Sequence, residues 1–344
     1  MQSLTFTEHQ THCYQTFQSL AENTQRIGGV PVLRWHSDGQ WSLDSGTELS
    51  QHQTLIHIVA QAPTLALLAS MIESLQRITP VSDCYIHPCS DFTSGTIGLV
   101  FPIETTDTAQ LKAPLLALGE AFSVEIGVTV DAPQLSQPGL LVMDMDSTVI
   151  AAECIDEIAV LAGAGDAVAE VTEQAMRGEL DFAESLRSRV ACLAGLEQRA
   201  LEKVKHKLPI MPGLNRLITS LHHHGWYIAI ASGGFTYFAD HLKTRFNLDA
   251  AVANQLEIVD NTLTGKVLGD IVDATTKAET VDALADRWSI SRQQTIAMGD
   301  GANDLTMMAA AQLGIAFRAK PVVQEKANVA IRTTGLDTAL FYLR

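Results

Sequence analysis

The chain has 344 residues and a formal net charge of −16 at pH 7, and 47% of its residues are hydrophobic while 18% are charged. This composition is typical of an ordinary globular protein with enough material for two domains. The acidic balance argues against a nucleic-acid partner, and an anionic substrate would need a local positive site. No apolar run approaches the length of a membrane span, so we expect no membrane partner either.

The cysteines and the N-terminus indicate a cytoplasmic protein. The five cysteines are odd in number and lack the spacing of a metal site: Cys13, Cys84, Cys89, Cys154 and Cys192. We interpret them as reduced thiols. Residues 1–25 contain no Lys or Arg and no apolar core, so they do not have the pattern of a signal peptide. A homodimer is compatible with the sequence.

Residues 1–50 are polar, with a hairpin signal at 37–39, and they indicate no function. From about residue 51 the periodicity becomes regular and predicts, in order, a strand at 55–60, a helix at 64–77, strands at 81–87 and 95–103, a helix at 107–121 and a strand at 124–130. This β-α-β-β-α-β order is that of the ferredoxin-like α+β fold. It resembles the ACT domain, a module that often binds amino acids, although the turn at 61–63 has no glycine. Regulatory and purely structural or dimer-forming roles are both open.

A polar, proline-flanked segment at 133–138 predicts a linker. We therefore divide the chain into an N-terminal region at 1–132, which contains the ACT-like domain at about 51–132, and a second domain at 139–344. Because every chemical motif described next follows the linker, a chain beginning near Gln134 is expected to keep its activity as long as it stays soluble.

The second domain is organised around residues 139–150. Residues 139–143 are a short, continuously apolar run, which predicts a strand buried in a parallel sheet. Asp144 and Asp146 follow it directly. Charges next to a core must be paired, hydrated or metal-bound, and open α/β sheets bind ligands at the carboxyl ends of their strands. A strand that runs out into an acidic turn is the alternative, but the alternating acids favour a functional site.

Three later stretches add further candidate site residues at predicted strand ends and at a helix start. These residues are Ser232, Gly233, Lys277, Asp300, Asn303 and Asp304. The four motifs, in this order, resemble those of the haloacid dehalogenase superfamily of phosphotransferases. The resemblance covers about two hundred residues, from Gly139 to near the C-terminus. It implies a doubly wound, Rossmann-like α/β fold with a parallel sheet, and the helical patterns after the first strand predict a helical cap at about 154–208.

The residue types fit hydrolysis of a phosphate monoester, which needs a nucleophile, charge neutralisation and a proton for the leaving alcohol. We expect Asp144 to be the nucleophile that forms an aspartyl-phosphate, and Asp146 to be the general acid and base. Mg²⁺ is the expected cofactor, bound by the carboxylates of Asp144 and Asp300 and by the backbone carbonyl of Asp146. Asp304 is expected behind these ligands, where it would orient waters.

The phosphate group is expected on the Ser232 hydroxyl and on the amides around Gly233, at a helix start where donors and the helix dipole favour anions. Lys277 is expected to add a positive charge to the phosphoryl group and to Asp144. Asn303 lies between the two acids of the last motif and is assigned to the same binding site.

The segment at 171–190 resembles the cap of phosphoserine phosphatases in particular. This resemblance assigns Glu153 to the substrate ammonium and Arg189 to the carboxylate, with Met176 and Phe182 as apolar residues that close over the site. A guanidinium can bind a carboxylate bidentately, and a cation such as an ammonium group stabilises a buried Glu carboxylate. Each of these residues, taken alone, is more simply explained as an ordinary surface or core residue, and it is their combination with the four motifs that favours a substrate site.

The sequence thus predicts a Mg²⁺-dependent phosphoserine phosphatase, a phosphoric monoester hydrolase that performs the last step of serine biosynthesis with a small-molecule substrate. An enzymatic alternative passes the phosphoryl group from Asp144 to another alcohol, such as homoserine. An alternative of another class is a regulatory binding protein with a vestigial phosphatase half, which the complete set of acids, serine and lysine disfavours.

Overall fold

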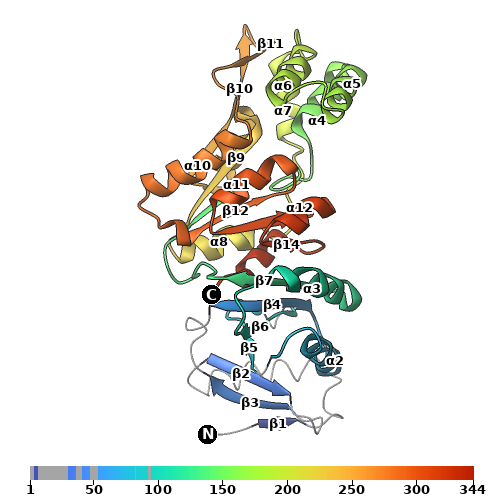
Figure 1. Cartoon of the computed structure of the whole chain (residues 1–344). Helices are drawn as coiled ribbons and strands as arrows, with labels where there is room; N and C mark the ends of the chain where they lie inside the picture. Colours follow the sequence, from blue (N-terminus) through green and yellow to red (C-terminus); the bar gives the residue numbers. More distant parts are fainter. Residues whose placement is uncertain (1–3, 7–29, 36–40, 47–52, 82, 92–93) are drawn as a thin grey trace. The chain divides into compact units, whose positions relative to one another are not determined.

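The computed structural model describes residues 4–6, 30–35, 41–46, 53–81, 83–91 and 94–344 (Figure 1). The contacts divide the chain into two compact units. The first unit comprises the chain up to Gln134 together with residues 328–344, and the second comprises Leu135–Ala327. None of the helices in the described ranges is both long enough and apolar enough to cross a membrane.

The first unit contains an antiparallel sheet with the strand order β1-β3-β2-β5-β6-β4-β7. Its elements are β1 (Leu4–Phe6), β2 (Val30–Trp35), β3 (Trp41–Gly46), β4 (Thr54–Gln61), α2 (Leu65–Gln76), β5 (Cys84–Ile86), β6 (Thr96–Ile103), α3 (Ala109–Phe122) and β7 (Glu125–Val130). The order from β4 to β7 confirms the predicted ferredoxin-like arrangement. The hairpin signal at 37–39 lies outside the described residues, but β2 and β3 on either side of it pair antiparallel. The closer resemblance to ACT domains stays a prediction.

The two helices of this unit share one core with the sheet. Ile56 and Ile58 of β4 pack in the same cluster as Leu68 of α2 and Leu115 of α3, and all four are buried. Because side chains alternate along a strand, His57 belongs to the opposite face of β4, where it is also buried.

That opposite face is covered by the C-terminal segment, which we define as residues 328–344. It contains β14 (Val329–Ile331) and a 3-10 helix (Leu336–Tyr342). The rings of His57 and Tyr342 meet edge to face at 5.7 Å between their centroids. A Cβ on Gly127 of β7 would lie 2.9 Å from both Tyr342 and Val329, so the close approach requires a glycine there. The expected second domain at 139–344 therefore differs from the unit that the contacts define, because its last residues pack with the first unit.

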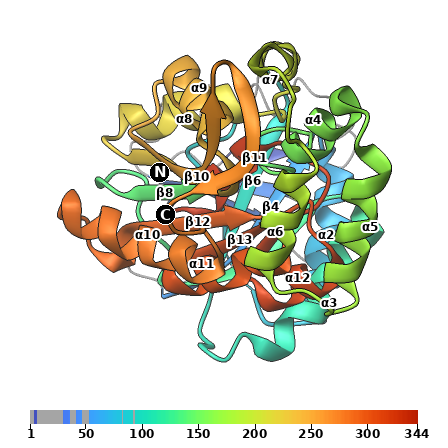
Figure 2. The same cartoon turned by 90° about the horizontal axis from the view of Figure 1, so that it is seen from above.

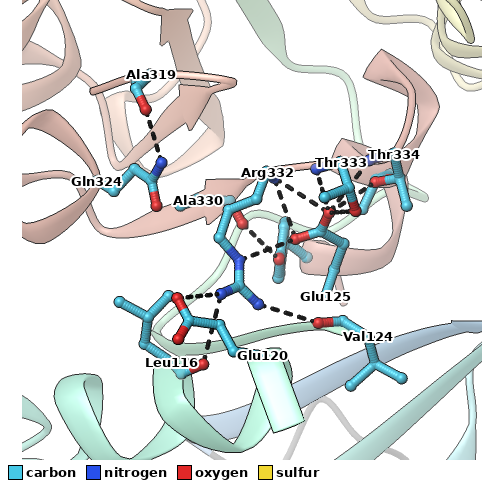
Figure 3. Close-up of polar contacts among 12 residues, drawn as sticks. Leu116, Glu120, Val124, Glu125, Ala319, Gln324, Ala330, Arg332, Thr333 and Thr334 are labelled. Carbon is cyan, nitrogen blue, oxygen red and sulfur yellow. Dashed lines mark hydrogen bonds and ion pairs between the residues drawn. The ribbon is translucent and has the colours of Figure 1, made fainter. Parts of the chain in front are cut away.

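Glu125, the first residue of β7, binds the C-terminal segment to the sheet through hydrogen bonds (Figure 3). Its buried carboxylate accepts hydrogen bonds from the backbone N–H groups of Arg332, Thr333 and Thr334 at 2.8–3.2 Å. The hydroxyls of both threonines also donate to Oε1, and the Arg332 Nε lies 3.6 Å from Oε2. A buried carboxylate is stable only when its charge and lone pairs are satisfied in this way.

The second unit contains a sheet with neighbouring strands in the order β11-β10-β9-β8-β12-β13. The pairs from β10 to β13 are parallel, and β11 pairs antiparallel with β10. Its strands are β8 (Leu140–Met143), β9 (Tyr227–Phe235), β10 (Ala250–Val259), β11 (Thr262–Leu268), β12 (Thr295–Gly299) and β13 (Leu313–Phe317), and its helices outside the cap are α8 (Leu214–His223), α9 (Thr236–Phe246), α10 (Ala274–Arg287), α11 (Leu305–Ala310) and α12 (Pro321–Lys326). Figure 2 shows α8 and α9 on one side of the sheet and α10 and α11 on the other. This confirms the predicted doubly wound fold, with the strand order reversing between β8 and β12.

The predicted cap consists of four helices between β8 and α8. They are α4 (Cys154–Ala162), α5 (Gly165–Met176), α6 (Phe182–Ala191) and α7 (Gln198–Lys205). An Asp181–Glu184 capping box begins α6. The β10–β11 hairpin, turning at Asp260 and Asn261, stands beside the cap helices (Figure 1). Both turn residues have positive φ, the backbone that a two-residue hairpin turn demands.

Candidate active site

A buried lysine between two buried aspartates forms the centre of the site. Lys277 Nζ donates to Asp144 Oδ1 and to Asp304 Oδ1, both at 2.7 Å. At most 9% of any of the three side chains is exposed. Burial alone would lower the pKa of Lys277, but the two carboxylates outweigh it and hold that pKa above its ordinary value. The lysine is therefore a fixed positive charge in a net acidic protein.

The fold explains why residues so distant in sequence meet here. Asp144 follows β8 and Asp300 follows β12, and these strands are paired, with Met143 opposite Met298. The strand order reverses between them, which opens a crevice at their carboxyl ends. Lys277 comes from the first turns of α10, whose N-cap residue Asp273 accepts from Thr276 N at 2.9 Å.

Carboxylates outnumber cations around this crevice. Burial, with the nearby charge of Glu153 as the next cause, raises the pKa of Asp146 to about 7. Burial and then the charge of Asp304 raise the pKa of Asp300 to about 6, and burial raises the pKa of Asp144 despite the lysine. Crowded acids resist ionisation unless a cation joins them.

The acids fit a divalent cation. Oxygens of Asp144, Asp300 and Asp304 all lie within 4.8 Å of one another. Hard cations such as Mg²⁺ are bound by oxygen ligands of this kind, together with waters and phosphate oxygens. Asp304 is fully buried and already accepts from Lys277 and from Gly301 N at 2.9 Å, so it is better suited to orient its neighbours than to bind an ion directly.

The carboxyl-terminal end of β9 forms a second wall. Ser232 is buried, and its Oγ accepts from Gly234 N at 2.9 Å. Both Ser232 and Gly233 lie within β9, and α9 begins only at Thr236, so the expected position of Gly233 at a helix start is shifted by three residues.

Sequence reasoning missed Asn254, which supports this wall. Asn254 lies on β10 and is 1% exposed. Its Nδ2 donates to Gly233 O at 2.8 Å, and its Oδ1 accepts from Val272 N at 2.8 Å. It therefore connects the end of β9 to the chain that leads into α10. The one signal in the sequence was a polar residue within a strand, because a buried polar side chain needs hydrogen-bond partners.

The cap supplies the remaining wall. Phe182 and Arg189 project from α6, and Glu153 is the N-cap residue of α4, where its Oε1 accepts from Ser147 Oγ at 2.7 Å. The Phe182 ring lies against Gly233, whose Cβ, if present, would be 2.8 Å from it.

Arg189 lines the cleft and has unsatisfied hydrogen-bonding capacity. Its Nε is buried and has no hydrogen-bond partner among the described residues. Burial lowers the pKa of Arg189 below its ordinary value, and Asp156, Glu153 and Asp146 partly offset this. A buried donor without a partner costs free energy, so this guanidinium is suited to an anionic ligand.

These walls enclose one cleft of about 280 Å³. Of the residues predicted from sequence, those that line it are Asp144, Asp146, Glu153, Phe182, Arg189, Ser232, Gly233, Lys277, Asp300 and Asn303. Asp304 lies behind it, bonded to Lys277. Met176 ends α5, and its side chain lies outside the part of the chain that the structure describes.

Comparison with known proteins supports the assignment of the fold and of the superfamily. The family model of the haloacid dehalogenase-like hydrolases matches residues 141–309. The chain is 54% identical over 217 residues to the phosphoserine phosphatase of Vibrio cholerae, a match that covers 63% of this chain and 66% of that relative. The crystal structure of a probable phosphoserine phosphatase from Vibrio cholerae superposes with a TM-score of 0.74 and 40% identity, covering 92% of this chain and 94% of the other. The chain belongs to the phosphoserine phosphatase family of the haloacid dehalogenase-like hydrolases.

A second similar structure is described as a phospho-aspartyl intermediate analogue of phosphoserine phosphatase. It has a TM-score of 0.57 and 38% identity, and it covers 60% of this chain and all of the other. The predicted superfamily, fold class and hydrolase activity are thus confirmed for this phosphatase, whereas the roles of single residues stay predictions.

Proposed function

We propose that this phosphatase hydrolyses O-phosphoserine to serine and phosphate with Mg²⁺ as its cofactor. One observation carries the proposal: a single cleft holds Asp144, Lys277 and Asp300 on its core side and the oppositely charged Arg189 and Glu153 on its cap side. A phosphate ester suits the first group. A carboxylate and an ammonium on the same small molecule suit the second.

The core side would perform the chemistry in two steps. A carboxylate oxygen of Asp144 attacks phosphorus, the ester P–O bond breaks, and the serine oxygen leaves with a proton from Asp146. Asp146 then takes a proton from water as that water attacks phosphorus, which breaks the bond to Asp144 and releases phosphate. The backbone N–H of Cys154 donates to Asp146 Oδ1 at 3.1 Å and so orients this carboxyl group. The solved phospho-aspartyl analogue of a relative supports the intermediate.

Mg²⁺, when bound, would neutralise charge on the phosphoryl oxygens and on the attacking carboxylate. Asp144, Asp300 and the backbone carbonyl of Asp146 would hold it, and Asp304 would orient the surrounding groups. Lys277 would contribute a second positive charge to the phosphoryl group, together with the hydroxyl of Ser232, the amides near Gly233 and Asn303.

The cap side would select phosphoserine. Arg189 has a buried Nε without a partner among the described residues, and a carboxylate would satisfy it. Glu153 would receive the ammonium, and Phe182 would close over the ester. Because the reaction would release free serine, it would serve as the last step of serine biosynthesis. The cysteine pattern expected of reduced thiols supports a cytoplasmic setting.

A substrate screen tests the proposal. Phosphate release is measured with Mg²⁺ from phosphoserine, phosphothreonine, phosphoethanolamine and sugar phosphates, and again after chelation of divalent ions. We expect phosphoserine to have the highest kcat/KM and chelation to abolish turnover. Adding homoserine to the assay and analysing products would reveal phosphoryl transfer. A different preferred substrate, or full activity in a chelator, would refute the proposal.

A further inference from the structure

The tip of the β10–β11 hairpin pairs with the cap through main-chain atoms. The cap side is the connection at 195–198 between α6 and α7, and the hairpin side is 261–263; together we name them the clasp. Three hydrogen bonds of 2.8 Å form it: from Gly195 N to Leu263 O, from Leu263 N to Leu196 O and from Gln198 N to Asn261 O. An antiparallel bridge joins Glu197 to Thr262. The cap connection thus acts as a short extra strand on β11.

Close packing accompanies these bonds. Leu263 of the hairpin and Leu193 of the cap are both buried. Gly265 has a φ of +82°, and a Cβ there would lie 2.9 Å from the Ala194 Cβ and 3.3 Å from backbone atoms of Ala191, the last residue of α6. Side chains larger than hydrogen at residue 265 would therefore push the hairpin away from α6.

The clasp lies next to the C-terminal end of α6, the cap helix whose residues line the cleft. Arg189 and Phe182 project from α6, and the clasp begins four residues after α6 ends. At its root the same hairpin carries Asn254, which bonds Gly233 O in the opposite wall. The hairpin therefore connects the end of β9 around Ser232, through Asn254 of β10, with the cap connection that follows α6, through residues 261–263.

We propose that the β10–β11 hairpin positions α6, and with it Arg189, over the cleft, and that Gln198 and Gly265 are the positioning residues of the clasp. The hairpin thereby sets the preference for a substrate with a carboxylate. This inference deepens the proposed function and rests on it. It requires that loosening the clasp affects phosphoserine more than a phosphate ester that has no carboxylate.

Gln198 allows one bond of the clasp to be removed selectively. It is the first residue of α7, a position that accepts proline, and Glu197 before it has the extended backbone (φ −69°, ψ 140°) that a following proline needs. Gln198→Pro therefore deletes the N–H that bonds Asn261 O while leaving the helix intact. Gln198→Ala is the matched control, because it also loses the side-chain hydrogen bond to Tyr237 but keeps the N–H.

We expect Gln198→Pro to lower kcat/KM for phosphoserine about fivefold relative to Gln198→Ala, the effect of one lost hydrogen bond. Hydrolysis of p-nitrophenyl phosphate should differ less than twofold between the two variants. Gly265→Ala should show the same split relative to Gly269→Ala. Gly269 has a similar backbone (φ +73°) but open space around its Cβ position, so this pair cancels backbone strain.

Hydrogen exchange of residues 182–191 in the full chain gives a readout that does not depend on any substrate. Exchange should be faster in Gln198→Pro and Gly265→Ala than in their controls. Equal exchange would show that the clasp does not hold α6, and parallel loss of both activities would show that it serves only the fold. Either result would overturn the inference. A wild-type chain that cleaves p-nitrophenyl phosphate but not phosphoserine would refute the proposed substrate, and the exchange comparison would still decide whether the hairpin positions α6.

Discussion

Replacing Glu125 with glutamine should weaken the attachment of the C-terminal segment to the sheet within the first unit. The substitution keeps the size of the side chain but removes the charge that faces Arg332 and presents an amide N–H₂ to donors. Three backbone N–H groups and two hydroxyls now donate to this carboxylate. Removing one partner of a buried charged network costs about 3–5 kcal/mol, because the remaining partners stay buried without compensation. The stability of the unit should fall by this amount.

Glu120→Gln is the matched control for this variant. Glu120 also meets Arg332, at 3.4 Å, but 69% of its side chain is exposed, and exposed ion pairs contribute about 0–1 kcal/mol. Native-state hydrogen exchange of the amides in β7 and β14 would report the free energy of opening for this part of the protein. Equal protection in Glu125→Gln and Glu120→Gln would refute the reasoning.

Three further outcomes are expected. Asp144→Asn should abolish phosphate release and the trapping of an acyl-phosphate, and near-normal turnover would show that the nucleophile is another residue. A chain beginning at Gln134 should elute as aggregates from size-exclusion chromatography, because the apolar residues of 328–344 lose the sheet that buries them. A monodisperse, fully active product would contradict this expectation. Burial lowers the pKa of His57 to about 3 and the pKa of His87 to about 4, so both rings are neutral in the fold. The free energy of unfolding should therefore be fully retained above pH 6.5 and should decline as the pH falls toward 4, with the unfolding constant rising by up to about tenfold per pH unit for each ring. A free energy of unfolding, measured with denaturant at several pH values, that does not fall over this range would exclude the effect.

The strands and the acids at their ends could be predicted because the relevant signals are local. A continuous apolar run such as 139–143 indicates a buried parallel strand, and charge directly after it has few structural uses. Lys277 is different: nothing in its local pattern places it against Asp144, 133 residues away, and the prediction depended on the resemblance between motifs.

The features that the sequence did not reveal depend on long-range pairing. Glu125 looks like an ordinary polar residue at the start of a strand, and its partners lie about 207 residues further along the chain. The clasp is formed by main-chain atoms, which leave almost no trace in residue types. Asn254 is a single polar residue whose neighbours in sequence give no sign of its partners, and only the fold shows that it is buried and bonded to Gly233 and Val272.

The most direct test of the central claim compares phosphoserine with phosphoethanolamine, which has the ammonium but lacks the carboxylate, in the wild-type chain and in Arg189→Ala. A charged hydrogen bond contributes about 1.5–3 kcal/mol, so the wild type should prefer phosphoserine in kcat/KM by roughly 10-fold to 150-fold. Arg189→Ala should lose most of this preference while hydrolysing phosphoethanolamine about as well as the wild type. A wild type without the preference, or a variant that keeps it, would contradict the assignment of this cleft to phosphoserine.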